Sequence, residues 1–182
     1  AHNNLGNALQ EKGDLNSAID SYQNAIKLNP DYLNAHNNLG TALQEKGDLN
    51  SAISSFQKAL QIKPDFAQAH YNLGKALQEK GDLNSAIDSY QNAIKIKPYY
   101  QDAHNNLGNA LKEQGDLNSA ILSFQKALKI KPDFAQAHNN LGNALKEKGD
   151  LDSAIDSFRY ALELNPDYEE AHYNLGNALQ ET

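Results

Sequence analysis

One asparagine recurs every 34 residues along the chain, and its side-chain amide has the chemistry to bind a peptide backbone. An amide accepts a hydrogen bond through its carbonyl oxygen and donates through its nitrogen, so it can pair with a backbone N–H and a backbone C=O at once. Asparagine costs a helix interior roughly 0.5 kcal/mol relative to alanine, so its recurrence in a helix indicates a use. We call this set the asparagine row. It comprises Asn4, Asn38, Asn72, Asn106, Asn140 and Asn174.

The spacing of the row suits an extended chain. Units that stack ~10 Å apart match about three residues of extended peptide at ~3.3 Å each, so the row could hold a backbone without reading its sequence. The position three residues later is also mostly polar and adds the candidate ligands Asn7, Lys75, Asn109 and Asn143. Two alternatives stay open: the asparagines link neighbouring helices, or they were copied by duplication without a role.

Two further rows flank the asparagine row and are predicted to make the groove rich in amides and nearly neutral. The first contains Asn3, Asn37, Asn105 and Asn139. The second contains Gln10, Gln44, Gln78, Lys112, Lys146 and Gln180. Within the asparagine row and the position three residues later, only Lys75 is basic, which disfavours a clamp for a terminal carboxylate.

Histidine and serine also recur, but their spacing does not favour a metal site or a nucleophile. With one histidine per unit, the imidazoles should stand ~10 Å apart, whereas zinc needs ligand nitrogens at ~2.0–2.1 Å. We therefore predict that the histidines pack and that no metal or other cofactor binds. The recurrent serines (Ser17, Ser51, Ser85 and Ser119) are expected to serve in the first turn of a helix. No nucleophile, base and orienting group coincide, which predicts that the chain is not an enzyme.

The composition excludes several classes of partner. The net charge is −7, and the aromatic residues do not alternate with a basic stripe, so nucleic acid is not expected as a partner. No apolar run reaches the ~18 residues of a membrane span, and no signal peptide is visible, which favours a cytoplasmic protein without membrane contact. The chain lacks Cys and Met and begins inside a repeat, so we expect a fragment of a longer protein.

The elements that position these residues are predicted to be pairs of helices. In the first unit, apolar residues recur at three- and four-residue steps on either side of Gly13-Asp14, which suits a turn between two amphipathic helices. Pro30 ends the second helix, and Asp31 is expected to cap the next one. The chain is predicted to be a single array, 1–182, with units 1–32, 33–66, 67–100, 101–134 and 135–168 and a terminal helix 169–182.

Small residues are predicted to bring the two helices of a unit close together. Gly40 should let the first helix approach its partner closely. Ala52 and Ala59 place small side chains on one face of the second helix, which should also allow close packing. Leu39 and Phe56 supply apolar bulk, and burying each contributes about 1.5–3 kcal/mol. A single unit cannot offset its ordering entropy, so neighbouring units must stack.

The 34-residue unit resembles the tetratricopeptide repeat (TPR). In the second unit, the residues that carry the resemblance are His36, Leu39, Gly40, Leu43, Ala52, Phe56, Ala59 and Pro64. Histidine stands where the family often has tryptophan, and Leu43 where it often has tyrosine. The resemblance implies an all-α solenoid, a right-handed superhelix whose groove is lined mainly by the first helix of each unit. The asparagine row is similar to that of the superhelical domain of the O-linked N-acetylglucosamine transferases and of similar bacterial TPR proteins.

Three functions follow from this pattern. The first is a non-catalytic protein-interaction scaffold that binds extended peptide through the asparagine row. The second is the substrate-recognition arm of a larger enzyme of the glycosyltransferase type. The third is end-to-end self-association, because Leu175, Ala178 and Leu179 of the terminal helix have no second helix to cover them.

Overall fold

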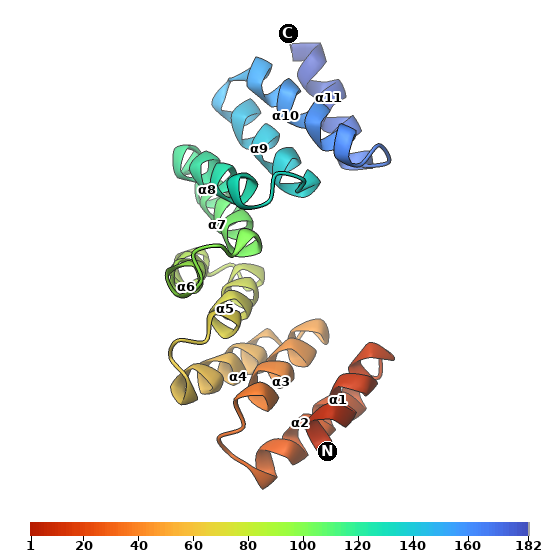
Figure 1. Ribbon diagram of the computed structural model, residues 1–182, viewed down its shortest axis with the longest axis vertical. Helices are drawn as coiled ribbons and strands as arrows, with labels where there is room; N and C mark the ends of the chain where they lie inside the picture. Colours follow the sequence, from red (N-terminus) through yellow and green to blue (C-terminus); the bar gives the residue numbers. More distant parts are fainter. Residues whose placement is uncertain (182) are drawn as a thin grey trace. The chain divides into compact units, whose positions relative to one another are not determined.

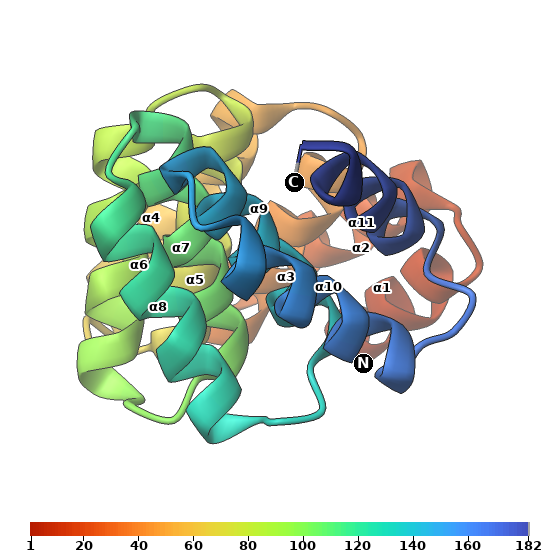
Figure 2. The ribbon, with the colours of Figure 1, turned by 90° about the horizontal axis from the view of Figure 1, so that it is seen from above.

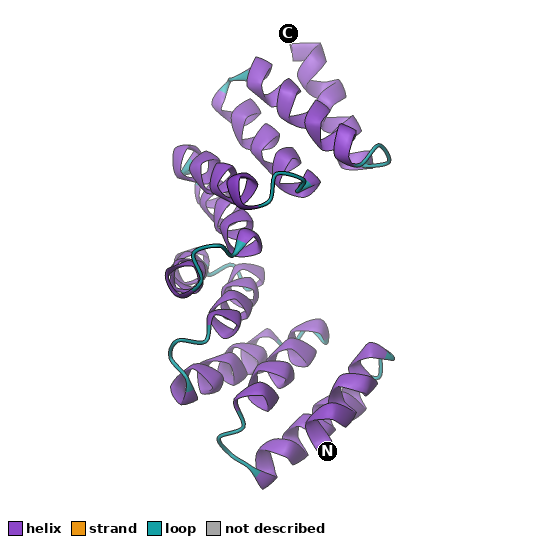
Figure 3. Cartoon of the chain, in the orientation of Figure 1, coloured by secondary structure: helices purple, strands orange, loops and turns teal. Residues whose placement is uncertain are grey.

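The computed structural model describes residues 1–181, and the regular structure of this part is entirely helical (Figure 3). None of its helices is long and apolar enough to cross a membrane. The first helices of the repeats are α1 (His2–Glu11), α3 (Leu33–Glu45), α5 (Ala67–Glu79), α7 (Gln101–Gln114), α9 (Ala135–Lys148) and α11 (Glu169–Glu181). The second helices are α2 (Leu15–Leu28), α4 (Leu49–Ile62), α6 (Leu83–Ile96), α8 (Leu117–Ile130) and α10 (Leu151–Leu164). The predicted all-α array of helical hairpins is confirmed.

Each second helix starts at an aspartate that follows a left-handed glycine. Gly13 has φ 80°, which an L side chain rarely adopts, and it reverses the chain after α1. The carboxylate of Asp14 then accepts a hydrogen bond from the backbone N–H of Ser17 at 3.1 Å. The same cap recurs at the starts of α4, α6, α8 and α10. The first-turn position predicted for the serines is confirmed.

The expected cap of the first helices is wrong. Helix α3 begins one residue later than the prediction needs, so Tyr32 is its N-cap residue and no side chain caps it. Asp31 therefore lies outside the cap position. A different bond holds this junction: the Nε2 atom of His36 donates to the backbone carbonyl oxygen of Pro30 at 2.8 Å.

The chain divides into two compact units, Ala1–Lys97 and Pro98–Thr182, which we call the first and second compact units. In the first compact unit (α1 to α6, Figure 1), α1 packs on α2 and α3, and α3 packs on α4 and α5. Its first helices touch one another, whereas α2 and α4 make no contact in the described residues. The first helices therefore form the inner layer of this compact unit, and Figure 2 shows α3 and α5 inside α4 and α6. In the second compact unit α9 likewise contacts both α7 and α11.

Glycine allows the helices of a hairpin to approach each other, as predicted. A Cβ atom on Gly40 would lie 2.6 Å from Cε1 of Phe56, closer than real Cβ atoms come. Ala52 and Ala59, on the same helix as this ring, are fully buried. The hairpin core is thus a second-helix aromatic ring packed onto the backbone of the first helix.

The terminal helix covers more of its apolar surface than the sequence suggested. Ala178 is fully buried in a cluster with Ile155 and Phe158 of α10, and Leu175 packs against this cluster. The expectation that Leu175 and Ala178 are uncovered is therefore wrong, because both face α10 instead of the open end. Leu179 is 48 % exposed.

Candidate functional site

The asparagine row lies on the first helices, where its members are half-buried except for the exposed Asn4. Four of them donate to an asparagine of the preceding first helix. The Nδ2···Oδ1 distances are 3.3 Å for Asn38 to Asn3, 3.1 Å for Asn72 to Asn37, 3.0 Å for Asn140 to Asn105 and 3.0 Å for Asn174 to Asn139. These bonds realise one alternative left open by the sequence, namely that the row links neighbouring helices.

The acceptors of these bonds do not line an open groove. Asn105 is 2 % exposed and Asn139 is 0 % exposed, and Asn3 and Asn37 are also buried. The prediction that this flanking row belongs to the groove surface is therefore wrong. Buried amides need partners, and each of these oxygens finds one in the asparagine row of the next repeat.

The linking bonds leave part of each amide for a ligand. An asparagine side chain carries two N–H donors and a carbonyl oxygen with two lone pairs. Asn140 and Asn174 each place one N–H on the preceding first helix. Contact between the asparagine row and a peptide stays a prediction.

The candidates three residues further on also lie on first helices of the repeats. Asn7 takes part in a hydrogen-bond network, because its Oδ1 atom accepts from Nδ2 of Asn38 at 3.0 Å. Lys75, Asn109 and Asn143 are half-buried at the corresponding positions of α5, α7 and α9. Their role as ligands also stays a prediction.

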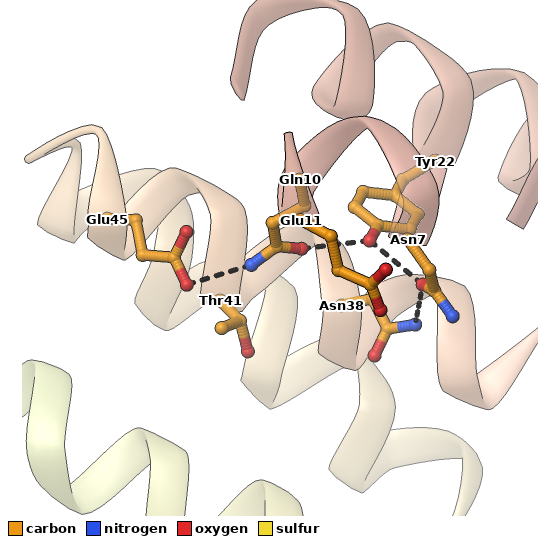
Figure 4. A pocket seen from close by; sticks show the side chains of 7 residues that line it. All are labelled: Asn7, Gln10, Glu11, Tyr22, Asn38, Thr41 and Glu45. Carbon is orange, nitrogen blue, oxygen red and sulfur yellow. Dashed lines mark hydrogen bonds between the residues drawn. The ribbon is translucent and has the colours of Figure 1, made fainter. Parts of the chain in front are cut away.

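A pocket of about 430 Å³ lies between α1 and α3, with one side chain from α2 (Figure 4). We call it the α1–α3 pocket. It is lined by Asn7, Gln10, Glu11, Tyr22, Asn38, Thr41 and Glu45. The hydroxyl of Tyr22 lies 2.9 Å from Oδ1 of Asn7 and 2.8 Å from Oε1 of Gln10. The Nε2 atom of Gln10 donates to the Glu45 carboxylate at 2.8 Å.

Sequence reasoning missed the glutamates of this pocket, although they recur at the 34-residue period. The row comprises Glu11, Glu45, Glu79, Glu113, Glu147 and Glu181. In the first compact unit, Glu45 and Glu79 accept from the neutral amides of Gln10 and Gln44. In the second compact unit, Lys112 and Lys146 form ion pairs with Glu147 and Glu181 at 3.0 and 2.8 Å. The expected neutral surface is therefore wrong for the first compact unit, where these two carboxylates accept from amides instead of cations.

Five of the six histidines bond at the junctions between repeats, in line with their predicted structural role. His70, His104, His138 and His172 repeat the bond of His36, with Nε2 2.8–3.0 Å from the carbonyl oxygen of the proline six residues earlier. Because a carbonyl oxygen only accepts, Nε2 must carry the hydrogen. In residues 1–181, no three His, Asp or Glu side chains are grouped to hold a metal ion.

Comparison with known proteins gives the family. The sequence model of the TPR repeat matches residues 6–47, 42–81, 78–115, 108–149 and 142–182. No curated protein sequence matches the chain significantly.

Several solved structures share the fold. A crystal structure of MamA is 33 % identical, with a TM-score of 0.82, and the match covers 88 % of this chain and 94 % of that one. YrrB, described as a TPR protein with an unusual peptide-binding site, is 24 % identical over 94 % of this chain and 89 % of its own, with a TM-score of 0.78. TTC0263, a thermophilic TPR protein of Thermus thermophilus, is 23 % identical, with coverage of 98 % and 97 % and a TM-score of 0.75.

The repeat matches run from residue 6 to the end of the chain, and each of them spans helices of the array. This chain belongs to the tetratricopeptide repeat family, whose members are generally non-catalytic protein-interaction scaffolds.

Proposed function

We propose that the chain is a protein-interaction scaffold that binds an extended peptide segment through the asparagine row on its first helices. Membership of the TPR family supports the interaction role. The description of YrrB as a TPR protein with a peptide-binding site supports a peptide as the kind of partner. The arm of a glycosyltransferase-type enzyme stays an alternative that no contact within the described residues favours.

The observation that carries the proposal is the anchoring of half-buried amides at one register of successive first helices. One N–H of Asn174 is held by Asn139, and one N–H of Asn140 by Asn105. This bond restricts the rotamer of each amide before a ligand arrives. A preorganised side chain loses less entropy on binding, so its remaining N–H and carbonyl oxygen bind a backbone at lower cost.

Alanine substitutions on the two sides of one linking bond test the proposal. Asn174→Ala and Asn139→Ala both break the bond between these residues, but only Asn174→Ala removes the half-buried amide of the asparagine row. Affinity for peptides selected from an array of random sequences should fall about 3- to 10-fold in Asn174→Ala, the equivalent of one lost hydrogen bond. Asn139→Ala should lower stability and retain more of the affinity.

The stability measurement separates contact from structure. Thermal unfolding followed by circular dichroism shows that each variant is folded at the temperature of the binding assay. If both variants lose affinity equally, or only in proportion to their loss of stability, the asparagine row has a structural role alone.

A further inference from the structure

The α1–α3 pocket holds more hydrogen-bond acceptors than donors. The bond from Asn38 fixes Asn7 with its carbonyl oxygen toward Tyr22, and the bond to Glu45 fixes Gln10 with its carbonyl oxygen toward the same hydroxyl. The Tyr22 hydroxyl thus meets two amide oxygens at 2.9 and 2.8 Å but has one hydrogen to donate. One oxygen–oxygen contact therefore lacks a hydrogen, and Figure 4 shows the three oxygens converging.

Because the Tyr22 hydroxyl is buried, bulk water does not readily supply the missing hydrogen-bond donor. Tyr22 is 1 % exposed, so its hydroxyl has little access to bulk water. Burial raises the pKa of the Tyr22 hydroxyl, and the negative charges of Glu45 and Glu11 raise it further. The two carboxylates therefore act electrostatically on the interior of the pocket.

The same carboxylates have no cation to balance them. In the described part of the chain, neither Glu11 nor Glu45 forms an ion pair, and Glu45 accepts only from the neutral Gln10. At the equivalent positions of the second compact unit, Glu147 and Glu181 are paired with lysines. Glu79, in the same compact unit as the pocket, likewise accepts from a neutral amide, that of Gln44. The lack of a lysine partner therefore distinguishes these carboxylates from those of the second compact unit and is not a consequence of the repeat itself.

The equivalent site between α3 and α5, 34 residues further along the chain, differs from the α1–α3 pocket at two residues that affect ligand binding. Phe56 replaces Tyr22, so the surplus hydroxyl is absent there. Lys75 replaces Thr41, so the chain supplies a basic residue of its own at this register. The α1–α3 pocket has neither change and keeps both its acceptors and its charge.

From this surplus of acceptors and uncompensated charge, we infer that the α1–α3 pocket binds the basic side chain, lysine or arginine, of an extended peptide. The inference rests on the proposed function and specifies its sequence preference. An ammonium or guanidinium group brings several N–H donors and a positive charge, whereas a bound water brings only two donors and no charge. Two carboxylates from α1 and α3 do not make the hard-cation ligand set of six or more oxygens that calcium takes.

Peptide arrays with matched charge-neutral substitutions test the inference. The full chain is incubated with an array of random peptides, and each selected peptide is re-tested with glutamine in place of every lysine and arginine. We expect one basic position to be preferred, and the preference to fall about five-fold for each of Glu11→Gln and Glu45→Gln, the upper range for an exposed ion pair. Added salt should weaken the same preference.

The control variant is Glu147→Gln, which removes a carboxylate at the same register that already has a lysine partner. It should leave the basic preference unchanged. Peptide binding without a basic preference, or a preference that survives Glu11→Gln with Glu45→Gln, overturns the inference and leaves the scaffold proposal standing. Absence of all peptide binding overturns both.

Discussion

At the scale of single residues, the histidines show how a repeated side chain acquires a structural role. His104 is buried, and its Nε2 atom bonds the carbonyl oxygen of Pro98 while its Nδ1 atom has no hydrogen-bond partner. Burial lowers the pKa of His104 below its usual value of 6.5, against the opposing effect of the Pro98 carbonyl. Burial likewise lowers the pKa of His138. Burial therefore favours the neutral form of both side chains.

The lowered pKa values predict a loss of stability in mild acid. In the unfolded chain these histidines bind a proton near their usual pKa of 6.5, whereas in the folded chain they bind it only at lower pH. The contribution of these two histidines to the free energy of unfolding is therefore fully present above about pH 6.5. It is lost as the pH drops from there through the pKa values of the folded chain. Urea unfolding at about pH 7.5 and about pH 5.5 measures this difference in the free energy of unfolding.

Substitution of the histidines tests whether His104 and His138 cause this pH dependence of stability. His104→Gln with His138→Gln should flatten the pH dependence, because glutamine does not titrate. His2→Gln is the control, since His2 is exposed. A pH dependence that persists unchanged in the double variant would contradict the assignment.

At the scale of elements, the hairpin depends on a ring packed against a helix backbone. The ring of Phe124 in α8 packs against the backbone of α7 at Gly108. A Cβ atom on Gly108 would lie 2.5 Å from Cε1 of this ring. Gly176 holds the same register in α11, but no atom lies within 4 Å of its added Cβ position. Glycine at this repeat position is therefore required in α7, whereas in α11 another residue can replace it.

This contrast predicts opposite effects of one substitution. Gly108→Ala should lower the free energy of unfolding by about 1–3 kcal/mol, because the ring or backbone must move. Gly176→Ala should raise it by up to about 1 kcal/mol, because alanine favours a helix more than glycine does. Chemical denaturation of the two variants measures both changes, and effects of the same sign would refute the close-approach argument.

At the scale of the whole molecule, stability should accumulate through contacts between neighbouring helices, as in other repeat arrays. Helix α11 packs on α10 and α9 and covers the cluster around Phe158. Deleting residues 166–182 should therefore lower the free energy of unfolding by at least about 2 kcal/mol, the contribution of one buried aromatic side chain. The midpoint of urea unfolding measures the change.

A surface substitution on the same helix provides the comparison. Tyr173 is 70 % exposed, so Tyr173→Ser should change stability by less than about 0.5 kcal/mol. Equal stability of the shortened and complete chains would show that α11 does not contribute to the array.

Features that depend on residues close together in the chain can be predicted from the sequence, whereas features that depend on distant residues cannot. The hairpins, the turn glycines, the serine positions and the packing of the histidines all depend on neighbours close in the chain. Their periodicity along the chain therefore predicts them correctly. The failed cap at Asp31 marks the limit of this reasoning, because one residue of difference in a helix start removes the geometry that a cap requires.

The asparagine row shows what the amino-acid sequence determined and what the tertiary structure decided. The 34-residue period determined that these amides lie at one register of successive first helices. Only the packing of one helix on the next decided that four of them bond a buried asparagine 35 residues earlier. Packing alone also placed Glu45 beside Gln10 and the hydroxyl of Tyr22. Such contacts depend on the spacing and crossing of two helices, which the periodicity within each helix does not specify.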